Sequence, residues 1–91
     1  MSGDGHDYHG WPNYETWLTY TWLSNDLYTD SACDALATQA HSEVAAADTL
    51  EDFVQERLPA LDEAGLSADL LRASLRHVDW QRLARAYRTR R

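Results

Sequence analysis

Two groups of side chains in this sequence could in principle do chemistry: a histidine- and aspartate-bearing segment near the start, and one cysteine. Residues 4–9 contain two aspartates with His6 and His9, side chain types that bind transition metals. Their spacing matches no standard zinc site, so we interpret the segment as a disordered polar tail rather than a metal site. Cys33 has Asp34 beside it and no basic neighbour in sequence to lower its pKa. We therefore expect a buried thiol, no catalytic residue and no metal or cofactor.

The acidic residues form two rows with helical spacing. Asp30 and Asp34 follow an aspartate at position 26 at intervals of four, and a second row has the same interval. On a helix, such rows place carboxylates about 6 Å apart along the axis, which could present a basic groove with something like a phosphate backbone. The alternative is two solvated faces. The predicted acidic partner-binding surface comprises Asp30, Asp34, Asp48, Glu51, Asp52 and Glu56.

The charges are divided unevenly along the chain. Fifteen Asp and Glu against eight Arg, with no Lys, give a net charge of −7. Residues 1–71 hold fourteen of the carboxylates and one Arg, whereas residues 72–91 hold seven Arg and one Asp. An acidic body repels nucleic acid and attracts basic proteins. The basic end could contact phosphates, or it could pair with the chain's own acidic helices. Acidity could also reflect genome composition or solubility.

Aromatic side chains are densest between residues 11 and 28, where six occur within eighteen residues. Bases stack on aromatics in positively charged grooves, but this stretch has no Arg, so direct nucleic-acid binding is not expected. We predict that Trp17, Leu18 and Trp22 anchor the core. The predicted aromatic partner-binding residues, which we expect to be partly exposed, are Trp11, Tyr20 and Tyr28.

The elements that must position these residues are helices. Apolar residues recur with helical spacing in five segments, and no segment alternates long enough for a strand, although 14–22 would permit one. We expect a compact all-α domain of four to five short helices over residues 11–91, after a flexible lead-in at 1–10. The predicted N-caps are Asn13, Thr49, Ser67 and Asp79, with one cap near 29–31. The predicted helices span 13–24, 29–47, 49–58, 67–78 and 79–87, and the last segment could instead be a kinked continuation of the fourth helix.

Composition narrows the cellular setting. No apolar run approaches the roughly 18–20 residues of a membrane span, so we expect no membrane association. One cysteine cannot form an internal disulfide, which is typical of a reducing compartment. We therefore expect a cytoplasmic protein.

Four stretches carry a resemblance. Residues 10–18 read GWPNYETWL, 22–26 read WLSND, 66–71 read LSADLL and 78–80 read VDW. They resemble a family of small proteins of phages, archaeal viruses and plasmids, which has the motifs G-W-x-N-x-E-T-W and W-x-x-N-D. That family is mostly of unknown function and offers no catalytic residues to transfer. The resemblance implies a mobile genetic element, whose small accessory proteins often counter host defence.

Together these features lead to two functional hypotheses. In the first, the chain is a non-enzymatic phage or mobile-element accessory protein, an anti-CRISPR-like inhibitor in the host cytoplasm. Its acidic surface would bind a basic nucleic-acid-binding site of a host protein or nucleoprotein complex. In the second, it is a small nucleic-acid-binding or regulatory module that acts through its Arg-rich C-terminus. Charge pairing between the two ends of neighbouring copies would also permit a homodimer.

Overall fold

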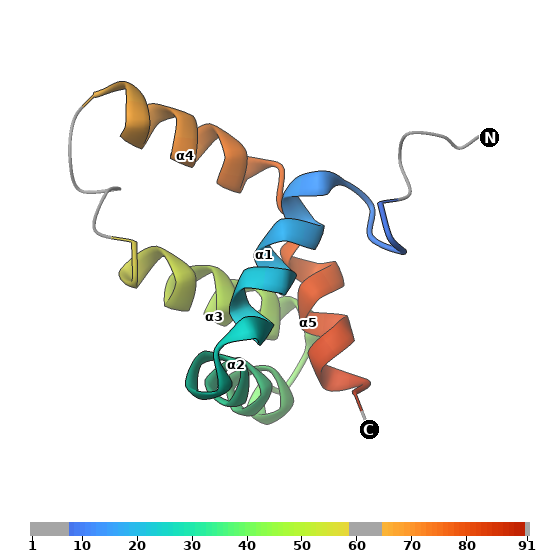
Figure 1. Cartoon of the computed structure of the whole chain (residues 1–91). Coiled ribbons are helices and arrows are strands. Elements are labelled where there is room, and N and C mark those ends of the chain that lie inside the picture. The colour runs from blue at the N-terminus through green and yellow to red at the C-terminus, as the bar shows by residue number, and fades with distance from the viewer. Residues whose placement is uncertain (1–7, 59–64, 91) are drawn as a thin grey trace.

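Five helices make up most of the computed structural model, which describes residues 8–58 and 65–90 (Figure 1). Within these ranges the only bridge of β type is an isolated one between Tyr8 and Trp11. The predicted all-α class is therefore confirmed. The helices are α1 (Tyr14–Asn25), α2 (Leu27–Gln39), α3 (Glu43–Glu56), α4 (Leu66–Arg76) and α5 (Trp80–Arg88).

Side-chain caps explain where most of the helices begin. Asn13 and Asp79 cap α1 and α5 as predicted, each accepting a hydrogen bond from the backbone amide three residues later. Asp26 caps α2 rather than a residue near 29–31, and bonds from the Thr29 hydroxyl and amide lower the pKa of this carboxylate. α4 begins at Leu66, one residue before the predicted cap, after Gly65 at a positive φ of 128°.

The predicted helix over 29–47 is wrong. α2 ends at Gln39, and the chain starts a new helix at Glu43 because the Ser42 hydroxyl accepts from the amide of Ala45 at 3.0 Å. The predicted cap at Thr49 is wrong for the same reason. Thr49 lies inside α3, where its hydroxyl donates to the carbonyl of Ala45. The alanine-rich stretch therefore belongs to two helices joined by a short turn.

The core is built around α3 and α5, with α2 packed against both and α1 crossing α2 and α5. Leu50 of α3 and Leu83 of α5 are fully buried, as is Tyr87. α4 packs least against the other described helices, and Figure 1 shows it at the upper edge of the molecule, apart from α3. The main helix packing is therefore among α1, α2, α3 and α5, and α4 lies at the edge of the molecule.

The prediction that Trp17, Leu18 and Trp22 of α1 anchor the core was partly wrong. Trp22 is 55% exposed and Leu18 is 45% exposed, so neither anchors the core. The fully buried positions of α1 are Leu23 and Thr16, a polar residue whose hydroxyl is satisfied by hydrogen bonds. Trp17 is half-buried against the ring of Tyr8, with 5.1 Å between the ring centres.

Part of the predicted lead-in and of the loop between α3 and α4 lies outside the described residues. This holds for His6 and for residues 1–7 as a whole, as well as for 59–64 and 91. Within the described part, Tyr8 exchanges two backbone hydrogen bonds with Trp11, at 2.7 and 2.8 Å. Tyr8, three residues before the predicted start of the domain, therefore makes defined contacts with the domain.

Candidate binding surfaces: an acidic helix face and an apolar groove

The first candidate surface is a row of carboxylates on α3, which we call the acidic row: Asp48, Asp52 and Glu56. All three side chains are exposed, since they lie on the side of α3 away from the buried Leu50 and Val54. In the part of the chain that the structure describes, none of the three accepts a hydrogen bond or forms an ion pair. The row therefore faces solvent, as both the predicted partner-binding surface and the alternative of a solvated face require.

Two other predicted site residues, Asp30 and Asp34, have partners within the chain. The guanidinium of Arg90 lies 2.8 Å from a carboxylate oxygen of Asp30 and 3.3 Å from one of Asp34. Arg90 also donates to the hydroxyl of Tyr20 at 3.0 Å, and the hydroxyl of Tyr87 donates to Asp30 at 3.2 Å. Hydrogen bonding to Asp30 and Tyr20 raises the pKa of Arg90, and burial raises that of Tyr87.

This arrangement, the Arg90 clamp, gives a stability prediction. Arg90→Ala should lower the free energy of unfolding by about 1–3 kcal/mol, because it leaves the half-buried carboxylate of Asp30 with one neutral donor. Urea unfolding measures the change. Arg76→Ala is the matched control, since Arg76 is exposed on α4 and has no partner among the described residues. Equal effects of the two substitutions would show that the clamp does not form in solution.

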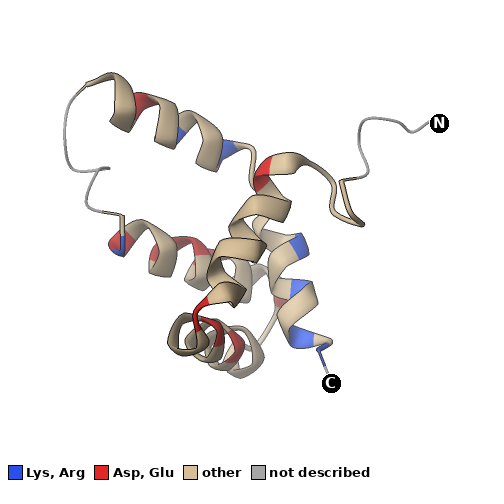
Figure 2. Cartoon of the chain, viewed as in Figure 1, with Lys and Arg blue, Asp and Glu red and all other residues tan. Residues whose placement is uncertain are grey.

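The three arginines of α5 that precede the clamp, Arg82, Arg85 and Arg88, also have partners inside the molecule. Arg85 pairs with Glu43 at 3.2 Å, and that hydrogen bond lowers the pKa of the carboxyl group. Arg88 donates to the carbonyls of Ala37 and Ala40 at 2.9 and 2.8 Å, so it caps the C-terminal end of α2. Figure 2 shows the arginines of α5 in blue and the acidic positions of α2 and α3 in red.

The predicted aromatic site does not assemble as one surface. The ring of Trp11 packs on that of Tyr20 at 4.7 Å, and the guanidinium of Arg82 lies 4.5 Å from the centre of the Trp11 ring. Tyr20 continues this stack onto Tyr87 at 5.6 Å. Trp11 and Tyr20 are therefore engaged internally. Tyr28 on α2 is 70% exposed, as predicted.

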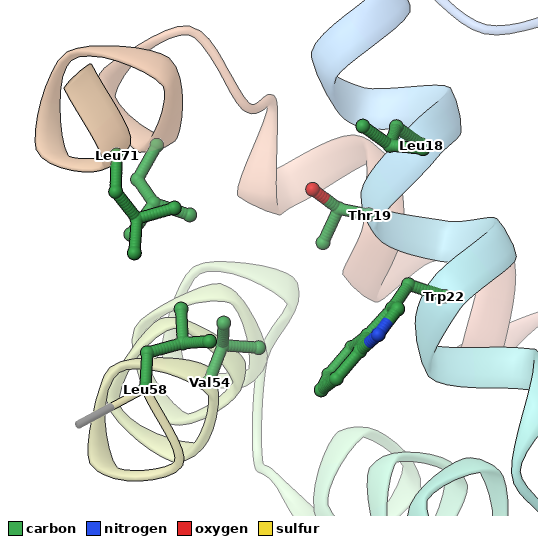
Figure 3. A pocket seen from close by; sticks show the side chains of 7 residues that line it. Leu18, Thr19, Trp22, Val54, Leu58 and Leu71 are labelled. Atoms are coloured by element: carbon green, nitrogen blue, oxygen red, sulfur yellow. The ribbon is translucent and has the colours of Figure 1, made fainter. Parts of the chain in front are cut away.

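The second candidate surface is an apolar groove between α1, α3 and α4, which sequence reasoning missed. Side chains from the three helices face one open space (Figure 3). The volume of this space is about 220 Å³. A second hollow of about 170 Å³ adjoins it, sharing Leu18, Thr19, Leu71 and Leu75 and extending to Tyr14 and Glu15. The residues that line the first hollow are Leu18, Thr19, Trp22, Val54, Leu58, Leu71 and Leu75.

A signal for the groove was present in the sequence. Tyr14, Leu18 and Trp22 lie four residues apart and share one side of α1. Periodicity shows that such residues share a face, but the same spacing is typical of a core stripe. Only the position of α4, set apart from α3, leaves this face open.

The described ranges contain no metal-ligand cluster and no exposed thiol. No cluster of three or more His, Cys, Asp or Glu residues there could hold a metal ion. Burial, and next the nearby charge of Asp30, raise the pKa of the Cys33 thiol to about 11. Among the described helices, none combines the length and apolar character needed to cross a bilayer. Comparison with protein-family models, curated proteins and solved structures finds no match for this chain.

Proposed function

We propose that this chain is a non-enzymatic binding protein that docks its acidic row onto a basic surface of another protein. The observation that carries the proposal is the absence of an internal role for Asp48, Asp52 and Glu56 within residues 8–58 and 65–90. The other described carboxylates, apart from Glu15, cap a helix or bond to another side chain. Like charges one turn apart weaken a helix by a few tenths of a kcal/mol per pair, so the row destabilises α3. No hydrogen bond or ion pair of the row within the described residues offsets this repulsion.

The surface beside the row suits a cationic side chain. A hollow of about 170 Å³ between α2 and α3 has an apolar floor formed by Leu36 and Phe53, with Asp52 and Glu56 at its edge. Long basic side chains bury their aliphatic stems on apolar surface and keep the charged head near water or an acid. The chain's own Arg57 already places its guanidinium 3.7 Å from the centre of the Phe53 ring. A basic partner could use the same kind of contact.

The class of partner follows from the row's spacing and charge. Carboxylates about 6 Å apart along a helix can occupy positions where a basic groove would hold phosphates, so the proposed partner is a protein or nucleoprotein complex with such a groove. The resemblance to phage and plasmid proteins extends the proposal to an inhibitor of host defence. The alternative, a nucleic-acid-binding module using the Arg-rich end, has less support because Arg82, Arg85, Arg88 and Arg90 have internal partners.

The test removes the charge of the row and keeps its shape. The triple variant Asp48→Asn, Asp52→Asn and Glu56→Gln should lose at least about tenfold in recovery of basic, nucleic-acid-handling proteins from a host lysate. The measurement is affinity capture on the tagged full chain, with nuclease treatment, two salt concentrations and quantitative mass spectrometry. Thermal unfolding should be unchanged or shifted slightly upward, because like-charge repulsion along α3 is relieved.

A charge-matched control is available in the same chain. Asp26→Asn, Asp69→Asn and Asp79→Asn removes the same charge from three exposed positions, and asparagine retains the capping role of aspartate at two of them. This control should capture the same proteins as the unchanged chain. Capture that survives in the row variant, or that falls equally in both variants, would contradict the proposal.

A further inference from the structure

The apolar groove is a second surface, separate from the acidic row. Its α1 wall is the ridge of Tyr14, Leu18 and Trp22, each about half exposed. The opposite wall is Leu71 of α4, and the floor is formed by Val54 of α3 and by Leu58, which follows the end of that helix (Figure 3). Large apolar side chains from three helices therefore face one open space, and no described residue fills it.

The shape of the groove fits side chains of a helix better than a small molecule. Its two hollows, of about 220 and 170 Å³, are each smaller than the roughly 300–1,000 Å³ of a typical ligand pocket. They adjoin along α1, one reaching Trp22 and the other Tyr14. Two apolar side chains three or four residues apart on a helix are separated by about 5–6 Å, so one helix could place a side chain in each hollow.

Charge decides between a second copy and a different partner. Glu15 lines the hollow nearer the start of α1 and has no partner among the described side chains. Two copies of a chain with net charge −7 repel each other, whereas a helix with Lys or Arg beside its apolar residues is attracted.

We propose that this groove binds one amphipathic, basic helix of another protein, with two apolar side chains of that helix seated one turn apart in the two hollows. Because Leu18 borders both hollows, it is the central contact. Trp22 closes one end, and Glu15 meets the basic flank. This contact does not depend on the acidic row, so each surface can fail its test without the other.

The test is a selection with peptides of defined length. A displayed library of random peptides of about 18 residues, or five helical turns, is selected on the full chain. Peptides that also bind the Leu18→Glu variant are discarded, because they do not require the groove. The enriched peptides should be helical when bound and positively charged, with apolar residues at i and i+3 or i+4. Their affinity, measured by fluorescence anisotropy, should fall at least about tenfold for Trp22→Ala, a second groove variant that does not depend on Leu18→Glu folding correctly.

Matched controls distinguish binding in the groove from nonspecific hydrophobic binding and from binding to the acidic row. Leu27→Glu makes the same change at a leucine that is 81% exposed and lines neither hollow, and it should leave binding unchanged. The variant with a neutralised acidic row should also retain binding. Three outcomes would overturn the proposal: enrichment of acidic or extended peptides, no peptide sensitive to Trp22→Ala, or a dimer in sedimentation equilibrium that Leu18→Glu dissociates.

Discussion

Asn13→Ala should lower the free energy of unfolding by about 2–3 kcal/mol, the sum expected for a lost helix cap and an orphaned polar group. Thr16→Val should lower it by a comparable amount, because it leaves the cap in place but removes the buried hydroxyl that accepts from the backbone amide of Asp79. For a domain of this size, that corresponds to a fall in Tm of roughly 10–20 °C. The two residues belong to the GWPNYETWL stretch. The expected effect is large because their side chains join the beginning of α1 to the junction between α4 and α5.

Hydrogen bonds of the Asn13 and Thr16 side chains hold this junction together. The side-chain oxygen Oδ1 of Asn13 accepts from the backbone amide and the hydroxyl of Thr16, at 2.9 and 2.6 Å, while the side-chain Nδ2 of Asn13 donates to the backbone carbonyl of His77 at 2.7 Å. The Thr16 hydroxyl in turn accepts from the backbone amide of Asp79 at 2.8 Å. Asp79 then caps α5 through the amide of Arg82. Removing either side chain leaves buried or half-buried groups without partners.

Controls for this prediction lie on the same helix. Thr21→Val and Asn25→Ala make the same chemical changes at exposed positions of α1 and should cost less than about 0.5 kcal/mol. Thermal and urea unfolding, followed by circular dichroism, compare the four variants. If Asn13→Ala and Thr16→Val behave like their controls, the motif does not serve stability, and its residues become candidates for contact with a partner.

Cys33 should react with a thiol reagent such as DTNB at pH 8 about 100-fold or more slowly than a solvent-exposed cysteine. The thiolate is the reactive form, and the rise of the Cys33 pKa from 9.0 to about 11 reduces its population by about that factor. Complete burial adds a steric barrier, since the reagent must wait for local opening. The sequence-based expectation of an inert, buried thiol predicts the same direction.

The matched control moves the cysteine by two positions on α2. Cys33→Ala with Ala35→Cys places the thiol at an exposed site of the same helix, and this variant should react at the rate of a free thiol. In urea the unchanged chain should also react at that rate, which shows that folding alone protects Cys33. Comparable rates for the native chain and the Ala35→Cys variant would indicate an accessible thiol and would reopen a catalytic role.

Local features of the fold could be predicted from the sequence because they depend on neighbouring residues. Asn13 and Asp79 were predicted as helix caps, and a cap is a contact between a side chain and an amide three residues away. The burial of Cys33 follows from its place on the apolar stripe of a helix, and the exposure of the acidic row follows from its place opposite such a stripe. The all-α class follows from the same periodicity.

Features that depend on distant residues were decided only by the tertiary structure. Asp30 and Asp48 are both aspartates and both belong to rows of the same spacing, yet Arg90, sixty positions from Asp30, forms an ion pair with Asp30 and not with Asp48. The end of α2 depends on Arg88, which reaches its carbonyls from α5. Whether the face of Leu18 and Trp22 is core or groove depends on where α4 packs. Periodicity fixes which side chains share a face, but it carries no information on which element covers that face.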